Sequence, residues 1–280
     1  MTISNYEYIL IWTLDTAAAI HYEIRATGIM SVVPMRQGVD HDLDYGIIVA
    51  PGVMAPSHQH IFCLRMDPAI DGYNTSSITY NVSIAKPVTK ARNPFGVAYG
   101  LETHEIHRSG HLDLEPSRNR IVKFINKEKV NAVTGKNPGY AIHVPATQLQ
   151  LSHATSTHAS RAEFADHHFY FTKQCEDELY PAGDYPWQSL GGDGVRGWAA
   201  RNEKLESQGV AWVNFGFTHN PRPEDWPVMP CEVFRVAIKP SHFFEKNPAL
   251  DMPASRQSVN QSSLVPKDDK EVVVGSCCGK

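Results

Sequence analysis

Two histidines one residue apart, His58 and His60, lie between two apolar stretches of the chain. If residues 58–66 form a β-strand, side chains two positions apart face the same side, so both imidazoles would point to one site. Imidazole nitrogen is a suitable ligand for zinc, copper, iron or nickel. Two ligands seldom hold a metal, and His219, which ends the strand-like run 212–218, is the best candidate for a third. Three neutral histidines without a thiolate would leave one coordination position open, as catalytic metal sites do.

Other histidines among the fourteen in the chain compete for this role. The run ETHEIHRSGH contains His104, His107 and His111 and resembles a zinc-protease motif only superficially. Its second histidine comes three residues after the first, whereas the helical motif needs four. His167 and His168 are adjacent, so on a strand they would face opposite sides. We therefore expect the metal at the first cluster.

A second chemical feature, Asn5-Tyr6-Glu7-Tyr8, opens the chain. Tyrosines in strands are usually packing residues, so the local sequence by itself favours a structural role for Tyr6. A chemical role for this tyrosine needs evidence from elsewhere in the chain.

The elements that must position these residues read as strands. Two are expected within residues 6–34 and two within 47–66, and residues 78–86 alternate apolar and polar side chains. With nineteen prolines and nineteen glycines between short strands, we predict an all-β protein with antiparallel strands in two packed sheets. Further strands are expected at Ala141–Val144, His168–Thr172, Val210–Phe217 and Glu232–Ile238, and short helices around Ser160–Ala165 and Gly197–Glu206.

The composition excludes several classes of protein. The chain has 26 Lys and Arg against 30 Asp and Glu, which gives no case for nucleic acid or an anionic membrane surface as a partner. No apolar run approaches the roughly 20 residues of a membrane helix, and the start of the chain does not read as a signal peptide. Five cysteines without a C-x-x-C pair predict neither a disulfide framework nor a thiolate zinc site. We interpret residues 1–253 as one domain and residues 254–280, rich in Ser, Gln, Lys and Asp, as a poorly ordered tail.

Taken in order, three motifs resemble the copper-containing amine oxidases. They are NYEY at residues 5–8, HQH at 58–60 and TH at 218–219 followed by NPRPEDWP. The resemblance runs from Ser4 to about Pro253. It also includes RATGIMS (25–31), RMDPAIDG (65–72), RAEFADHHFYFTK (161–173), ELYPAGDYPWQS (178–189) and FGFTHNPRPEDWPVMPCE (215–232).

This resemblance implies a specific chemistry. In the family, the tyrosine of the motif is converted in place to topaquinone, which here would be Tyr6, and the residue matching Asn5 helps to orient the ring. The resemblance also implies Cu(II) held by His58, His60 and His219. No ordinary side chain offers an electrophilic carbonyl, and a redox metal beside a phenol can supply one with O2. The implied reaction converts a primary amine and O2 to an aldehyde, ammonia and hydrogen peroxide.

The resemblance further implies a peripheral calcium-type site near Asp67 and Pro68, with carboxylate oxygen as the expected hard ligand. Eleven residues before the third copper histidine the family usually has an aspartate, and this chain has Gln208, which would leave that site weakened or empty. The family's catalytic aspartate lies far upstream of its quinone tyrosine. We therefore expect this chain to be the C-terminal part of the catalytic domain, a β-sandwich incomplete on its N-terminal side and without that base.

Three hypotheses for function remain at this point. The first is a copper- and topaquinone-dependent primary-amine oxidase, and the second is a truncated copper-binding fragment of such an enzyme with impaired turnover. The third is a zinc hydrolase that uses the same three histidines, which would need a carboxylate base near the metal. The family also implies a homodimer with arms exchanged between subunits. The compartment stays open, with cytoplasm or peroxisome expected before secretion.

Overall fold

The structure of the chain is a computed structural model that describes residues 1–36, 38, 44–187 and 190–253. The tail predicted for 254–280 lies outside these residues, so the division at residue 253 stays a prediction. No helix within the described ranges has the length and apolar character needed to span a bilayer.

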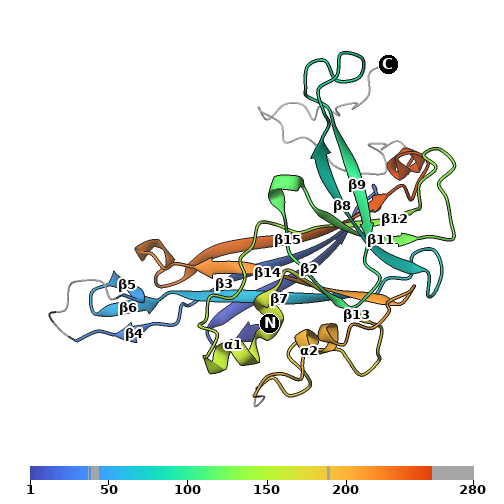
Figure 1. The fold of residues 1–280 in the computed structure, drawn as a ribbon. Helices are drawn as coiled ribbons and strands as arrows, with labels where there is room; N and C mark the ends of the chain where they lie inside the picture. Colours follow the sequence, from blue (N-terminus) through green and yellow to red (C-terminus); the bar gives the residue numbers. More distant parts are fainter. Residues whose placement is uncertain (37, 39–43, 188–189, 254–280) are drawn as a thin grey trace.

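The largest layer is an antiparallel sheet of eight strands in the order β1-β2-β3-β15-β12-β11-β8-β9 (Figure 1). Its buried positions are filled by β-branched and aromatic residues that suit a pleated, half-buried surface, such as Ile24, Ile78 and Phe124. Its strands are β1 (Thr2–Ile3), β2 (Tyr6–Leu14), β3 (Ile20–Gly28), β8 (Ser76–Ala85), β9 (Tyr99–Glu105), β11 (Ile121–Asn126), β12 (Gly139–His143) and β15 (Met229–Ser241).

A second antiparallel sheet has four strands in the order β10-β13-β14-β7. These strands are β10 (Gly110–Leu112), β13 (Phe169–Lys173), β14 (Gly209–His219) and β7 (His58–Met66). A small sheet of three strands projects to one side of the molecule in Figure 1 and consists of β4 (Val33–Pro34), β6 (Val53–Pro56) and β5 (Gly46–Ala50).

The hydrophobic core lies between the two larger sheets. Tyr8 of β2 packs edge-on against Phe62 of β7 with ring centroids 5.6 Å apart, and Tyr22 of β3 meets Phe215 of β14 at 6.3 Å. One cluster of buried apolar side chains contains residues of both sheets. The prediction of an all-β antiparallel sandwich is confirmed, and its packing brings β2 over β7 and β14.

Some element predictions were wrong in detail. Residues 47–66 contain three strands instead of two, because β5 and β6 form a short hairpin before β7. Strands β9, β10 and β11 were not predicted. The helix expected at Gly197–Glu206 is α2, Val195–Ala200, which ends before Asn202 takes a positive φ of 56°. The helix expected at Ser160–Ala165 is the end of α1, Thr157–Arg161, followed by the 3₁₀ turn Glu163–Asp166.

Candidate metal centre

Antiparallel pairing of β7 with β14 brings the three candidate histidines together. The register places His58 directly opposite His219, and His60 opposite Phe217. Side chains alternate along a strand, so His58, His60 and His219 share the face that points toward β2. One nitrogen from each imidazole lies within 4.8 Å of the others, and no other group of three or more His, Cys, Asp or Glu in the described residues meets this condition. The convergence expected from the sequence is therefore present.

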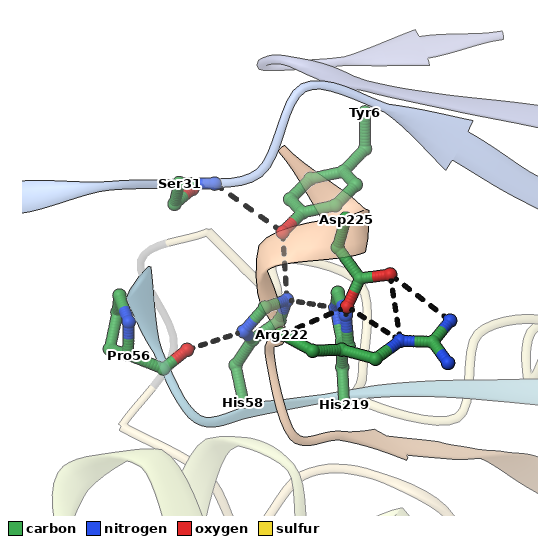
Figure 2. A network of polar contacts seen from close by, with 7 residues as sticks. All are labelled: Tyr6, Ser31, Pro56, His58, His219, Arg222 and Asp225. Atoms are coloured by element: carbon green, nitrogen blue, oxygen red, sulfur yellow. Dashed lines mark hydrogen bonds and ion pairs between the residues drawn. The ribbon is translucent and has the colours of Figure 1, made fainter. Parts of the chain in front are cut away.

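The outer nitrogens of two imidazoles have fixed partners, which assigns their tautomers. His58 Nδ1 is 2.8 Å from the Pro56 carbonyl oxygen, and His219 Nε2 is 3.1 Å from Asp225 Oδ2 (Figure 2). A carbonyl and a carboxylate can only accept, so we place the imidazole proton on each of these outer nitrogens. Asp225 is itself held by the Arg222 guanidinium, at 3.2 Å from Oδ1. Such partners orient the ligands of a metal and fix which nitrogen binds it.

The inner nitrogens then carry lone pairs, and these lone pairs converge on one point. His58 Nε2 and His219 Nδ1 are 3.3 Å apart, a repulsive arrangement for two lone pairs and an attractive one with a cation between them. His60 Nε2 is buried and has no hydrogen-bond partner among the described atoms. Three nitrogen donors without a thiolate suit copper or zinc. The residues present fit a metal ion at this centre.

Burial favours the neutral imidazole at His58 and His60, the form that binds a metal. Desolvation, with smaller contributions from His58 and His219, lowers the pKa of His60 to about 4. Desolvation also lowers the pKa of His58. His60 is further held by Phe217, whose ring is stacked on the imidazole at 4.7 Å. At neutral pH both rings offer an unprotonated nitrogen.

A phenol from the other sheet reaches the same centre. Tyr6 is 7% exposed, and its hydroxyl lies 2.7 Å from His58 Nε2, the inner nitrogen (Figure 2). The backbone N–H of Ser31 donates to the same hydroxyl at 3.4 Å. Desolvation raises the pKa of Tyr6, so the group is a neutral phenol in this surrounding. The tyrosine that local sequence assigned to packing thus points at the histidine cluster.

The backbone around Tyr6 is held by the turn that follows β3. The Asn5 side-chain amide donates to the Ile29 carbonyl, and the Ile29 N–H donates to the Asn5 carbonyl at 2.9 Å. Gly28 has a φ of +110°, and a Cβ there would lie 2.7 Å from the Asn5 carbonyl oxygen and 3.1 Å from Tyr6 Cα. Only glycine allows this close approach. The Asn5–Ile29 hydrogen bonds therefore hold the backbone next to Tyr6.

Sequence reasoning missed two residues of this centre. Asp225 is 3% exposed in the 3₁₀ turn Pro223–Asp225, and Tyr8 has its hydroxyl 2.6 Å from His60 Nδ1. Burial alone would raise the pKa of Asp225, but hydrogen bonds from His219 and Arg222 lower it. The signals for both were present, because Asp225 stands in the quoted run NPRPEDWP and Tyr8 in NYEY.

The chain matches known proteins over most of its length. Residues 1–259 match the family described as copper amine oxidase, enzyme domain. The chain belongs to the copper amine oxidase family. It is 42% identical to copper amine oxidase 1 of Aspergillus niger over 271 residues, which cover 96% of this chain and 40% of that protein. It is 34% identical to a peroxisomal primary amine oxidase of Pichia angusta, covering 100% of this chain and 42% of the relative.

A solved structure shows the same fold. The copper-containing benzylamine oxidase of Hansenula polymorpha is 39% identical, with a TM-score of 0.86 over 91% of this chain and 40% of that one. The chain spans about 40% of the length of these proteins.

The remaining predicted positions have partners of their own. The carboxylate of Asp67 is 3.7 Å from the Arg65 guanidinium, and the carbonyl of Pro68 accepts from the Ser76 hydroxyl. Ser76 and Gln208 form an isolated parallel β-bridge through their backbones, which places Gln208 near this loop. A cation here would have to compete with Arg65. The calcium-type site stays a prediction, which a calcium titration of the folded chain would test.

The other histidines are occupied differently. His111 and His167 stack with centroids 3.6 Å apart, and both His167 and His168 direct Nδ1 to Asp113, at 3.0 and 2.9 Å. The expectation that His167 and His168 face opposite sides was wrong, because both residues precede β13 and both contact the carboxylate of Asp113.

Proposed function

We propose that this chain carries the copper and cofactor centre of an enzyme that oxidises primary amines with O2 to aldehyde, ammonia and hydrogen peroxide. The cofactor would be a topaquinone made from Tyr6. The observation that carries the proposal is the contact of 2.7 Å between the Tyr6 hydroxyl and His58 Nε2, inside a buried cluster of three histidines. A phenol that must be oxidised in place needs this proximity to a redox metal.

The roles of the residues follow from their contacts. His58, His60 and His219 would hold Cu(II) through their converging nitrogens. The bound ion would supply redox chemistry with O2. The Ser31 N–H and the Asn5 contacts hold Tyr6 on one side, and burial removes bulk water from its ring. Asp225 keeps the proton of His219 on Nε2, away from the metal.

A zinc hydrolase with the same ligands is the less favoured hypothesis. It would need a free carboxylate beside the metal to activate water. The carboxylate in the network of Figure 2 is Asp225, and its two oxygens are engaged by His219 and Arg222. The group that faces the cluster is the Tyr6 phenol instead. These contacts support an oxidase centre.

A second candidate is a copper-binding chain that does not turn over by itself. It is favoured by the contacts of Asp225, the carboxylate drawn in Figure 2, whose oxygens are already engaged by His219 and Arg222. A base for proton abstraction is typically worth about 10²–10⁴ in rate. Peroxide release from the isolated chain with benzylamine and with histamine decides between the two candidates. Copper and a quinone without peroxide would favour the second.

We also propose a homodimer. The β8–β9 hairpin stands away from the body of the molecule (Figure 1), and near its tip Phe95 is 87% and Val97 80% exposed. Large apolar side chains gathered on a projecting arm are typical of a surface that a partner covers. Sedimentation of the parent and of a Phe95→Ser/Val97→Ser variant would test this, and identical monomeric profiles would refute it. The location in cytoplasm or peroxisome also stays a proposal, which a fluorescent fusion in living cells would test.

The decisive experiment joins the metal to the cofactor. Chain purified without metal and loaded with Cu(II) should bind close to one ion, and His219→Ala should bind it much more weakly. After exposure to O2, phenylhydrazine should give a coloured adduct on the peptide that contains Tyr6. Tyr6→Phe should keep copper and lose the adduct. His143→Ala is a matched control, since His143 lies on β12 and is not in the converging group. Copper retained by His219→Ala, or an adduct retained by Tyr6→Phe, would overturn the proposal.

A further inference from the structure

Tyr8 is buried beside the candidate copper centre, two residues after Tyr6 and on the same face of β2. It is 8% exposed, and its hydroxyl lies 2.6 Å from His60 Nδ1, the nitrogen that points away from the other two histidines. We propose that Tyr8 is a positioning residue of the copper site, whose hydroxyl holds Nδ1 of His60 and so presents Nε2 to the metal. This inference rests on the proposed function, because it assumes His60 as a ligand.

The partner of His60 differs in kind from those of the other two ligands. Pro56 and Asp225 can only accept, so they fix the tautomers of His58 and His219 permanently. A tyrosine hydroxyl can donate or accept. When Tyr8 donates to Nδ1, His60 carries its proton on Nε2 and cannot bind a metal through that nitrogen. When Tyr8 accepts from Nδ1–H, Nε2 is a free ligand.

Tyr8 therefore lets one ligand change tautomer on metal loading without losing its hydrogen bond. In chain stripped of metal, an Nε2–H on His60 relieves the repulsion among three converging lone pairs. In the loaded chain, the proton is on Nδ1, and Nδ1–H donates a hydrogen bond to the same Tyr8 oxygen. His58 and His219 have no such freedom, so His60 is the ligand whose state follows the metal.

The surrounding contacts make the position of the Tyr8 oxygen rigid. Its ring packs edge-on against Phe62, with centroids 5.6 Å apart. The Tyr8 N–H donates to the Met1 carbonyl at 2.8 Å, and the Met1 amino group donates to the Tyr8 carbonyl at 2.7 Å. The stacked Phe217 ring restricts tilting of His60, and the Tyr8 hydroxyl restricts its rotation within the ring plane. Together the two contacts fix where Nε2 points.

A purely structural role for Tyr8 predicts a different outcome from this proposal. Tyr8→Phe keeps the ring and removes one oxygen. The matched control is Tyr170→Phe, since Tyr170 is 1% exposed and its hydroxyl donates to the Glu163 carbonyl at 3.1 Å, away from the histidine cluster. Both variants lose one buried hydrogen bond, so a structural role would lower the melting temperature alike in both and leave copper binding equal.

The test measures copper affinity by chelator competition, together with the copper EPR spectrum, in the full chain. Loss of a partner of a ligand typically costs about 10–100-fold in metal affinity. We expect a loss of that order and a changed copper hyperfine splitting for Tyr8→Phe, and parent behaviour for Tyr170→Phe. Parent affinity and spectrum in Tyr8→Phe would overturn the inference. His60→Ala distinguishes a failure of the ligand assignment from a failure of the role of Tyr8. If His60→Ala binds copper as the parent does, the ligand assignment has failed. If it loses copper while Tyr8→Phe does not, only the role of Tyr8 has failed.

A measurement on unsubstituted chain gives the same answer if Tyr8→Phe does not fold. In zinc-loaded chain with ¹⁵N-labelled histidine, the proton of His60 should be on Nδ1 and should exchange slowly with solvent. In chain stripped of metal, it should be on Nε2. An Nδ1 proton that exchanges freely in the loaded chain, or a tautomer that does not change on loading, would contradict the proposal.

Discussion

Replacing Gly216 by alanine should disrupt the proposed copper centre although none of the three histidines is substituted. Gly216 lies on β14 opposite Ile61, next to the pair formed by Phe217 and His60. A Cβ at this position would lie 2.0 Å from the His60 carbonyl oxygen and 2.9 Å from Ile61 Cα. An ordinary contact begins at 3.4 Å, so the two strands would have to move apart by about 1.4 Å. Strands pair at about 4.8 Å, and a displacement of this size breaks the local ladder.

β14 cannot move away freely, because its other side is also bonded. The Gly216 N–H donates to Thr147 Oγ1 at 2.8 Å, and the Thr147 hydroxyl donates back to the Gly216 carbonyl at 3.1 Å. Overpacking costs about 1–3 kcal/mol and each hydrogen bond lost about 1 kcal/mol, so we expect roughly 2–4 kcal/mol of destabilisation. Metal–ligand distances tolerate only about 0.2 Å. A shift of the His60 backbone should therefore weaken copper binding at least tenfold, which is about 1.4 kcal/mol.

Guanidinium unfolding and copper competition on the same samples measure both effects. Gly110→Ala is the matched control, since Gly110 lies in β10 and a Cβ there would have no neighbour within 4 Å. That variant should keep the stability and copper affinity of the parent. A Gly216→Ala chain with parent stability and parent affinity would show that the β7–β14 register does not hold the site, and the argument would fail.

Two further predictions concern β3. Gly28→Ala should reduce formation of the phenylhydrazine adduct while copper binding is kept, because its Cβ would press on the Asn5 carbonyl and on Tyr6 Cα and not on the histidines; equal adduct yield in the variant and the parent would contradict this. Glu23 is buried, and hydrogen bonds, first from Arg235, hold its pKa below the ordinary value. A lowered pKa contributes stability that is present above about pH 4.3 and is lost as the pH falls through the folded-state pKa. The difference in melting temperature between the parent and Glu23→Gln should therefore shrink in acid. A difference that stays constant would refute this prediction.

The convergence of the three histidines could be predicted because it depends on one strand period and one pairing. His58 and His60 share a face in any strand, and His219 ends a run that reads as a strand without further information. The all-β class followed in the same way from short apolar runs between prolines and glycines. These are local signals, and the structure confirms the fold that they indicated.

What could not be predicted depends on exposure and on contacts between sheets. Strand β9 is almost fully exposed and lacks the apolar alternation that marks a strand with one buried face. Strand β11 does alternate, with Val122 and Phe124 buried, so its sequence carries the pattern of a half-buried strand. The end of α2 depends on the left-handed backbone at Asn202, which periodicity does not show. Tyr8 contacts a histidine 52 positions away in the chain, and Asp225 contacts His219, six positions before it, through a 3₁₀ turn that strand and helix periodicity do not show.

The division of the centre between two sheets explains why Tyr6 could not be assigned from local sequence. The three histidines belong to β7 and β14, so their convergence needs only one strand pairing. Tyr6 and Tyr8 belong to β2 in the other sheet and meet the histidines only when the sandwich packs. The proposed copper binding therefore depends first on the β7–β14 register, whereas the place of the phenol depends on the packing of one sheet on the other. A change that loosens the sandwich should move Tyr6 away from His58 before it separates His58 from His219, because the latter two are joined by their own ladder.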